Sequence, residues 1–453
     1  MLTGTRRHAG LRAAFWLPVF FFLLLSGCKP PEESNQKAII GAVLIDGRGG
    51  PPISDSVVIV AGSRIRAAGP RASVPIPAGT EKIDGSGKFL VPGLIDLHVH
   101  PGARGGPVYV GADHTAERIE RNLNAYLYFG VTSVRSMGTD LPPAFAVRKA
   151  ERDGTLATTR LFTAGAGFTA PGGPPSQEVG HIVNETNSPD DARKRVAALA
   201  AQNVDAIKIW VDGPPALKIK RPVIEAILDE ARKFQIPVTA HIATLSDTQH
   251  LVDNGAAGFM HMVRDTEDVS PEFLARLRSL STVFTPTLVR QELAWLYTEH
   301  PELLDDPDVA RSVEADRVAG VKAAARAAKA SAADREEFDR AMRNTRKFAA
   351  AGVLIGVGSD GGSASDFPGL MTHREMALLA EAGLAPMDVI VAATRTGAVA
   401  LGKLADLGTI EPGKLADLFL VTANPLEDVR NLRKIQAVML NGQWVDRAGL
   451  KLK

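Results

Sequence analysis

The central part of the chain predicts an α/β protein built as a (β/α)₈ TIM barrel. Short apolar runs alternate there with segments such as "PVIEAILDEARKFQ", whose apolar residues recur at helical spacing. Eight strands alternating with helices are typical of this fold, and 453 residues accommodate one barrel with an appendage. The predicted strands are residues 90–99, 131–134, 160–164, 206–210, 238–242, 258–263, 283–288 and 353–358.

The two ends of the sequence predict a small β-sandwich. Residues 38–88 and 405–453 contain short β-branched runs separated by turn-forming residues, as in "DSVVIVAGSRIRAAG" and "KIQAVMLNGQWV". We expect these two pieces to pair with each other, which leaves residues 89–404 for the barrel.

Two segments depart from the alternating pattern of the barrel. Residues 165–187 form a loop rich in Gly and Pro after the third predicted strand, and residues 290–349 form a helical insert after the seventh. A loop this long within a compact domain is usually functional or mobile. We expect both segments to lie over the mouth of the barrel.

The first residues predict an export signal. Arg6, Arg7 and Arg12 precede the uncharged run "AAFWLPVFFFLLL", which is too short to span a bilayer as a helix. The run ends in "LSGC", which resembles a bacterial lipoprotein signal cleaved before a lipidated cysteine. Cys28 is the only cysteine of the chain, so it has no partner for an internal disulfide. We therefore expect residues 1–28 to be the signal with Cys28 lipidated, residues 29–37 to be a tether, and the exported protein to be anchored to a membrane, facing the periplasm or the cell surface. A plain signal peptide with an incidental thiol is the alternative.

The charge balance excludes some classes of partner. The net charge is +1, and aromatic and basic residues are not clustered together, so the sequence gives no sign of a nucleic-acid-binding groove. A small-molecule substrate is the partner we expect, and a homo-oligomer is compatible with the composition.

Residues able to bind a metal stand at the ends of the predicted barrel strands, where a barrel of this kind carries its chemistry. They are His98 and His100 on strand one, Lys208 on strand four, His241 on strand five, His261 on strand six and Asp360 after strand eight. A single His-x-His pair is weak evidence, but ligand-type residues at five strand ends in order predict a metal site. Histidine and aspartate together suit a divalent ion such as Zn²⁺.

Lys208 is the unusual member of this set. In "AIKIW" it faces opposite to Ile207 and Ile209, so it points into the barrel, where an unpaired lysine is costly. A neutral amine there can react with CO₂ to form a carbamate, whose two oxygens can bridge two metal ions. Pairing with Asp212 is the structural alternative.

These motifs resemble those of the amidohydrolase superfamily, in its imidazolonepropionase-like and prolidase-like branch. "VPGLIDLHVH", "VTAHI" and "GVGSDGG" resemble its strand ends, and "LGTIEPGKLADLFLVTANPLEDV" resembles its closing segment. The resemblance implies a barrel with a sandwich built from both termini, and two metal ions. His98, His100 and Asp360 would hold the buried ion, His241 and His261 the exposed one, and carboxylated Lys208 would bridge them.

The resemblance also implies a mechanism. A hydroxide between the metals would attack a carbonyl polarised by the exposed ion, and Asp360 would accept its proton and pass it to the leaving nitrogen. The candidate catalytic residues are Asp360, His261 and His181. His181, in the long loop, would bind substrate or polarise the carbonyl, and a solvated histidine is the alternative for it.

Some positions differ from the family pattern or have a weaker assignment. Ser136 stands where many relatives have an acidic residue, and Met262 stands where glycine is frequent. Arg135 could bind a substrate carboxylate, but we expect a structural ion pair. We expect His373 and Arg374 to begin a helix after strand eight and to contribute to packing.

The function expected from these residues is hydrolysis of a C–N amide bond in a dipeptide or N-acyl amino acid. One alternative is the opening of a cyclic amide or lactone. Lys208 argues against it, because imidazolonepropionase resembles a one-metal enzyme without a bridging carbamate. The other alternative is an inactive ligand-binding lipoprotein, which would be expected to have lost metal ligands that this chain retains.

Overall fold

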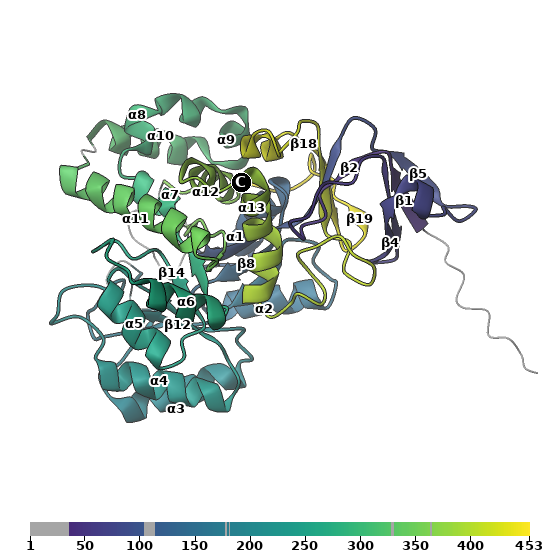
Figure 1. Ribbon diagram of the computed structural model, residues 1–453. Helices are drawn as coiled ribbons and strands as arrows, with labels where there is room; N and C mark the ends of the chain where they lie inside the picture. The colour runs from purple at the N-terminus through teal and green to yellow at the C-terminus, as the bar shows by residue number, and fades with distance from the viewer. Residues whose placement is uncertain (1–35, 104–113, 177–178, 181, 328–329, 363–364) are drawn as a thin grey trace, which may run out of the picture. The chain divides into compact units, whose positions relative to one another are not determined.

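The computed structural model describes residues 36–103, 114–176, 179–180, 182–327, 330–362 and 365–453 (Figure 1). The residues from Asn35 onward form one compact unit. The predicted signal segment and Cys28 lie outside the described residues. No helix in the ranges above is both long and apolar enough to cross a membrane.

The central part of the chain is a barrel of parallel strands, as the sequence predicts. Among the described residues, its eight strands are β7 (Leu94–Val99), β8 (Val131–Ser136), β9 (Arg160–Thr163), β12 (Ile207–Trp210), β13 (Val238–His241), β14 (Gly258–Met260), β15 (Val283–Thr285) and β16 (Leu354–Ile355). Two sheets form the wall, with the orders β7-β8-β9 and β12-β13-β14-β15-β16 in its parallel core. The wall closes where the Leu97 amide donates to the Val357 carbonyl (2.9 Å) and the Asp205 amide donates to the Thr163 carbonyl (2.7 Å).

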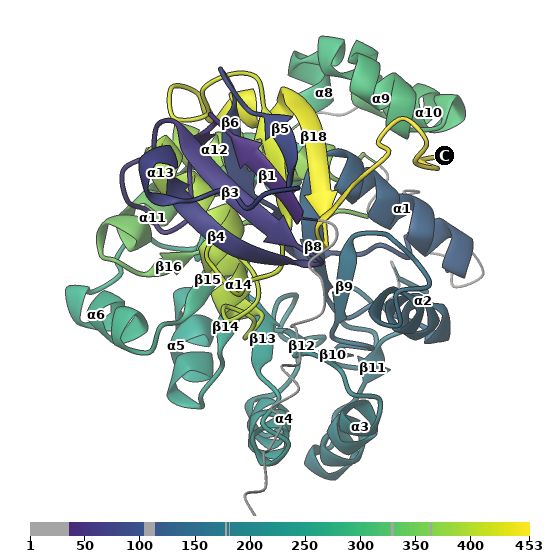
Figure 2. The ribbon, with the colours of Figure 1, turned by 90° about the vertical axis from the view of Figure 1, so that its right-hand side faces the viewer.

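The helices connect successive strands and surround the wall (Figure 2). They are α1 (Ala116–Tyr128), α2 (Pro142–Arg152), α3 (Pro189–Ala201), α4 (Arg221–Lys233), α5 (Leu245–Asp253), α6 (Pro271–Ser279), α12 (Leu370–Glu381), α13 (Pro386–Val391) and α14 (Gly397–Ala400). Hydroxyl side chains cap several of their N-termini, among them Thr115, Ser188, Thr244 and Ser270. Each such cap contributes about 1 kcal/mol to the stability of its helix.

The long loop and the insert both contain regular structure. Within residues 165–187, β10 (Phe168–Thr169) pairs with β12 and β11 (Asn184–Glu185) pairs with β10, so part of the predicted loop extends the barrel sheet. The insert is helical, as predicted, and α11 (Ala332–Ala350) is its longest helix among the described residues. The other α-helices are α7 (Leu288–Glu292), α8 (Leu296–Glu299), α9 (Pro307–Ser312) and α10 (Ala315–Ala327).

Two further sheets form the small β-unit. One has the order β4-β3-β1-β5, and the other has the order β19-β18-β17-β6-β2. Their strands are β1 (Gln36–Ile40), β2 (Val43–Leu44), β3 (Ser56–Ala61), β4 (Arg64–Pro70), β5 (Glu81–Asp84), β6 (Phe89–Pro92), β17 (Leu418–Val421), β18 (Ile435–Leu440) and β19 (Gln443–Trp444). N-terminal and C-terminal strands therefore share one sheet, because β6 pairs with both β2 and β17. A separate apolar cluster that includes Ile39, Val58, Leu90 and Leu418 packs within this unit.

Two predicted boundaries of this unit are wrong. The expected single strand 90–99 is divided at Gly93, because β6 pairs antiparallel with β17 while β7 enters the barrel. A Cβ at Gly93 would lie 2.2 Å from Thr132 Oγ1, so only glycine fits where the chain changes sheets. The expected tether to residue 37 also ends earlier, because β1 begins at Gln36 and pairs with β3.

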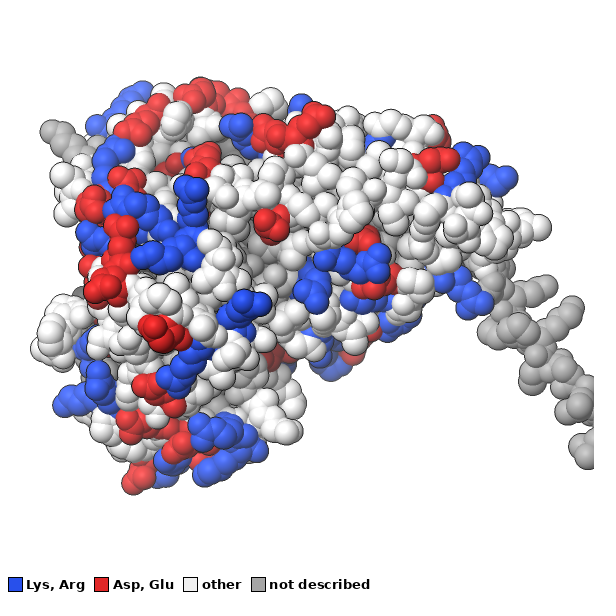
Figure 3. Space-filling model, in the orientation of Figure 1, with Lys and Arg blue, Asp and Glu red and all other residues white. Residues whose placement is uncertain are grey.

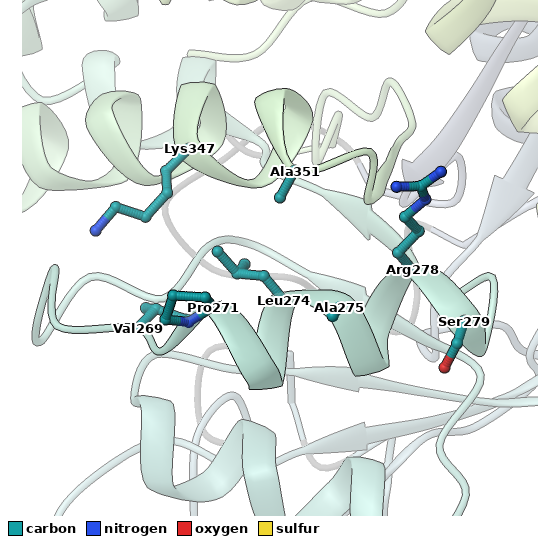
Figure 4. Close-up of a pocket in the computed structure, with 8 residues that line it drawn as sticks. All are labelled: Val269, Pro271, Leu274, Ala275, Arg278, Ser279, Lys347 and Ala351. Carbon is teal, nitrogen blue, oxygen red and sulfur yellow. The ribbon is translucent and has the colours of Figure 1, made fainter.

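The outer surface of the barrel carries mixed charge and one open apolar groove. Lys, Arg, Asp and Glu are interspersed over the face shown in Figure 3, in line with a net charge of +1. The groove has a volume of about 770 Å³ and lies between α6 and the end of α11 (Figure 4). Leu274 and Ala275 line it on one side and Lys347 and Ala351 on the other, and none of its lining residues is a predicted metal ligand.

Candidate metal centre

The ends of the barrel strands bring most of the predicted ligands together. His98 is on β7, His100 directly follows it, and Asp360 follows β16. One nitrogen from each histidine and one oxygen from Asp360 all lie within 4.8 Å of one another. Asp360 Oδ1 is 3.1 Å from His98 Nε2 and 3.0 Å from His100 Nε2. These three side chains therefore form a group with the geometry to hold one cation.

His241 and His261 extend this group to the next strands. The His241 and His261 rings are 4.0 Å apart, and the His261 ring is 5.2 Å from that of His98. His261 Nε2 lies 3.8 Å from Asp360 Oδ2. Burial lowers the pKa of His98 and His261 well below the usual value. The two imidazoles are therefore neutral at pH 7, and their lone pairs are available for a metal.

Lys208 is completely buried on β12, two residues before Trp210. Its Nζ lies 5.3 Å from the Trp210 ring and has no hydrogen-bond partner within the described structure. The alternative of pairing with Asp212 is not what the structure shows, because Asp212 Oδ2 lies 3.0 Å from His241 Nε2 instead. Burial lowers the pKa of the Lys208 amine to about 7, so a large fraction of it is uncharged at neutral pH.

Two threonines orient the histidine rings. His100 Nδ1 is 2.8 Å from Thr139 Oγ1, and His261 Nδ1 contacts Thr287 Oγ1. Each contact occupies Nδ1 and leaves Nε2 facing Asp360. A partner on the second ring nitrogen is the usual way in which a protein fixes a metal-binding histidine.

Asp96 links the chain segments that carry the candidate ligands. It is fully buried, and its carboxylate accepts hydrogen bonds from the backbone amides of His98 and Ser359, each at 3.1 Å, and from the Thr372 hydroxyl at 2.7 Å. Asp96 therefore ties β7 to the segment that carries Asp360. Burial raises its pKa to about 6, against the opposing effect of these hydrogen bonds.

Three residues of the centre have left-handed backbone conformations. The φ angles are 67° at His261, 51° at Thr287 and 59° at Asp360. For residues other than glycine this conformation costs on the order of 1–3 kcal/mol each, and it persists only where the surrounding structure enforces it. Such strain concentrates at functional sites, which supports this group as the functional centre.

The remaining residues singled out from the sequence do not belong to the ligand group. His181 falls outside the described residues. Arg135 is buried, and it donates to the carbonyls of Leu97 and Ala400 rather than forming the expected ion pair. His373 Nε2 lies 2.8 Å from the Phe129 carbonyl and Arg374 pairs with Glu292, both as parts of α12. Ser136 donates to Asp140 at 2.7 Å, and Met262 is buried in the core.

Sequence reasoning missed Thr287 and Arg290. Both follow β15, which ends at Thr285 instead of residue 288, and Arg290 Nε reaches to 3.7 Å from Asp360 Oδ2. The motif "TPTLVR" starts where a barrel strand ends, and this position could have marked Thr287 and Arg290 as candidate site residues. The helical pattern that starts at residue 290 assigned Arg290 to the insert instead.

Comparison with known proteins identifies the family. The model of the amidohydrolase family matches residues 89–445. The chain belongs to the amidohydrolase family. This agrees with a cluster of neutral imidazoles and a carboxylate, since enzymes of this family depend on metal.

Individual relatives are distant or are matched over short segments. An imidazolonepropionase from Ralstonia nicotianae is 26% identical over 419 residues, which cover 82% of this chain and 88% of that protein. The chain spans only 8–15% of the length of other curated relatives, among them an imidazolonepropionase from Caulobacter vibrioides, 47% identical over 60 residues that make up 13% of this chain. The crystal structure of a putative prolidase from Bifidobacterium longum is similar at a TM-score of 0.74 and 25% identity, covering 92% of this chain and 96% of that one. This match supports the barrel fold with small terminal sheets.

Proposed function

We propose that this chain is a metal-dependent hydrolase of C–N amide bonds, and that its substrate is a small dipeptide or N-acyl amino acid. The observation that carries the proposal is a set of buried side-chain nitrogens gathered at the ends of the barrel strands. Lys208 Nζ and His261 Nε2 are buried and have no hydrogen-bond partner within the described structure, while the buried His241 Nε2 lies 3.0 Å from Asp212 Oδ2. Unsatisfied polar atoms are costly in a protein interior, so the unpartnered nitrogens of Lys208 and His261 near Asp360 suit a site built for cations.

The donor set suits two divalent ions, for which we propose Zn²⁺. His98, His100 and Asp360 would hold one ion and His241 and His261 the other, with Lys208 as a carbamate between them. Nitrogen and carboxylate donors of this kind are those that zinc prefers. When bound, such ions supply a Lewis acid for the substrate carbonyl and lower the pKa of water.

Side chains of the protein would transfer the proton and exclude water from one side of the centre. Asp360 lies within 4 Å of His98, His100 and His261, and we assign it the role of taking a proton at Oδ2 and passing it to the leaving amide nitrogen. His261, held through Nδ1 by Thr287, keeps Nε2 aimed at the same carboxylate. Trp210 packs with Val179 and Val183 into an apolar wall next to Lys208 that excludes water from this side. For His181 we propose contact with the substrate.

Ring opening is a second candidate, favoured by the similarity to imidazolonepropionase over most of the chain. Lys208 favours amide hydrolysis, because a buried amine with no partner could react with CO₂ to form a carbamate, whose oxygens would bind metal ions.

The test is the metal content and activity of the purified chain. We expect about two zinc ions per chain by elemental analysis, and hydrolysis of dipeptides or N-acyl amino acids in a panel that also contains lactones and cyclic amides. Cleavage of lactones or cyclic amides alone would support the second candidate. A folded chain that binds no divalent metal and cleaves nothing in the panel would disprove both.

We also propose that Cys28 is lipidated and anchors the exported protein to a membrane. The support is the segment "LSGC" after an uncharged run. Metabolic labelling with an alkyne fatty acid should mark the wild type and not Cys28→Ser, whereas equal labelling of both would contradict the proposal.

A further inference from the structure

We propose that Arg290 determines specificity by binding a carboxylate on the leaving-group side of the substrate's amide bond. The inference rests on the proposed hydrolysis of amides and assigns the residue that recognises the substrate. It predicts that the released amine carries an acidic group, as in a dipeptide or N-acyl amino acid with a free α-carboxylate.

Arg290 faces the centre while remaining accessible. Its Nε lies 3.7 Å from Asp360 Oδ2, and its side chain is 46% exposed whereas that of Asp360 is 14% exposed. Within the described ranges, Arg290 is the one lysine or arginine that forms an ion pair with Asp360. A substrate that reaches Asp360 therefore has this guanidinium beside it.

The guanidinium of Arg290 is free to bind. It makes no hydrogen bond to another described residue, and its long contact with Asp360 is beyond hydrogen-bond distance. Other basic side chains near the barrel mouth are already engaged. Arg264 donates to the Ile242 carbonyl at 3.0 Å, and Lys218 pairs with Asp247. A planar guanidinium with free N–H groups matches the two oxygens of a carboxylate.

Contacts between α7 and α12 fix the backbone position of Arg290. Arg290 lies in α7, and α12 holds both ends of this helix. Glu375 Oε2 accepts a hydrogen bond from the Val289 amide at 2.8 Å, and Arg374 Nε donates to Glu292 Oε2 at 2.8 Å. Arg290 lies between these two fixed points, so its backbone is placed by contacts that involve none of its own side-chain atoms.

The role proposed for Asp360 indicates which side of the scissile bond carries the carboxylate. If Asp360 delivers a proton to the leaving nitrogen, that nitrogen lies beside Asp360 in the complex. A carboxylate bound by Arg290 is then attached close to this nitrogen, and the α-carboxylate of the released amino acid meets this requirement. A carboxylate on the acyl side would lie across the scissile bond from the guanidinium.

The experiment compares acid and amide forms of one substrate. Kinetic constants are measured for N-acetyl-L-leucine and N-acetyl-L-leucinamide with the wild type and Arg290→Gln. We expect the wild type to prefer the acid, and Arg290→Gln to lower kcat/KM for the acid by about 10- to 100-fold, mainly through KM. The KM for the amide, which has no carboxylate to bind, should change much less than that for the acid, and Arg290→Lys should recover part of the loss. Arg276→Gln is the control, because it removes an equally exposed arginine (47%) that pairs with Asp253 on another surface.

A binding measurement separates this inference from the proposed function. Calorimetric titration of the metal-loaded chain with the same two compounds does not require turnover. If the wild type cleaves neither compound but binds the acid more tightly than the amide, and only Arg290→Gln loses that preference, the role of Arg290 holds while the proposed function fails. If Arg290→Gln affects acid and amide equally, or if the wild type does not discriminate between them in either measurement, the inference is wrong.

Discussion

Asp360 is the residue on which the proposed chemistry depends most directly. It faces His98, His100 and His261 within 4 Å, so it is placed both to hold a cation and to move a proton. Asparagine has nearly the same shape, but its side-chain amide cannot accept a proton at the pH values at which a carboxylate does. We expect Asp360→Asn to lower kcat by about 10²- to 10⁴-fold.

The measurement is steady-state hydrolysis together with elemental analysis of the variant. Asp153→Asn, at an exposed carboxylate that pairs with Lys149, should leave kcat unchanged. An Asp360→Asn variant that contains its metal and keeps kcat within a few-fold would remove Asp360 from the mechanism.

The burial of Lys208 predicts how the free energy of unfolding depends on pH. Burial lowers the pKa of its amine from 10.5 to about 7, while in the unfolded chain the amine stays protonated to much higher pH. Between pH 7 and 10 the unfolded state therefore binds more protons, so Lys208 makes the free energy of unfolding rise with pH across this window. Its destabilising effect is fully present below pH 7. Lys208→Met removes the charge and keeps an unbranched apolar stem.

We expect Lys208→Met to stabilise the metal-free protein at pH 6.5 much more than at pH 9.5. Urea unfolding in the presence of a chelator measures this difference. Lys149→Met, at a lysine whose side chain is 75% exposed, should show no such pH dependence. A gain for Lys208→Met that is the same at both pH values would mean that the amine is not buried in its charged form.

At the scale of the elements, the centre depends on close packing between the first and last barrel strands. A Cβ at Gly358 would lie 2.4 Å from Thr285 Cγ2 and 2.8 Å from His98 Cβ. Gly358→Ala should therefore displace His98, lower the metal content and cost about 1–3 kcal/mol of stability. Thermal unfolding and elemental analysis measure the two effects.

Gly50→Ala is the matched control, because nothing lies within 4 Å of its added Cβ. If Gly358→Ala melts at the wild-type temperature and keeps its metal, the strands are less tightly packed than described.

The same elements show what the sequence could and could not predict. The gathering of the candidate ligands was predictable, because parallel strands alternate side chains between two faces and end together at one rim, so His98, His100 and Asp360 were expected to lie close together. The break at Gly93 was missed, because apolar residues continue on both sides of Pro92 and Gly93 and only pairing with a distant strand shows that the chain changes sheets there. Arg290 was missed because its orientation depends on the left-handed Thr287 and on contacts with α12, which no local pattern reveals.

At the scale of the molecule, a buried ion pair joins the barrel to the small β-unit. Arg160 on β9 donates to Asp417 at 2.6 Å, directly before β17, and also donates to Asn441 at 2.6 Å. Asp417→Leu would leave the Arg160 charge buried without its hydrogen-bonded carboxylate, which costs about 3–5 kcal/mol. We expect the double change Arg160→Met with Asp417→Leu to recover most of this loss.

Denaturant unfolding of the single and double variants forms a thermodynamic cycle that isolates the pair. If the double variant is as unstable as the sum of the two single variants, the two side chains are not coupled. Activity should follow stability here, since neither residue belongs to the metal centre.

The shared sheet also has a consequence for synthesis on the ribosome. Strand β6 is made early, yet its neighbour β17 emerges more than three hundred residues later. At roughly 5–20 residues per second, this interval lasts tens of seconds. Throughout it the edge of β6 is exposed, and the first-made histidine ligands lie on the chain directly after it. The nascent chain therefore carries a long-lived, unpaired strand edge that can pair with another chain until its own C-terminus is released.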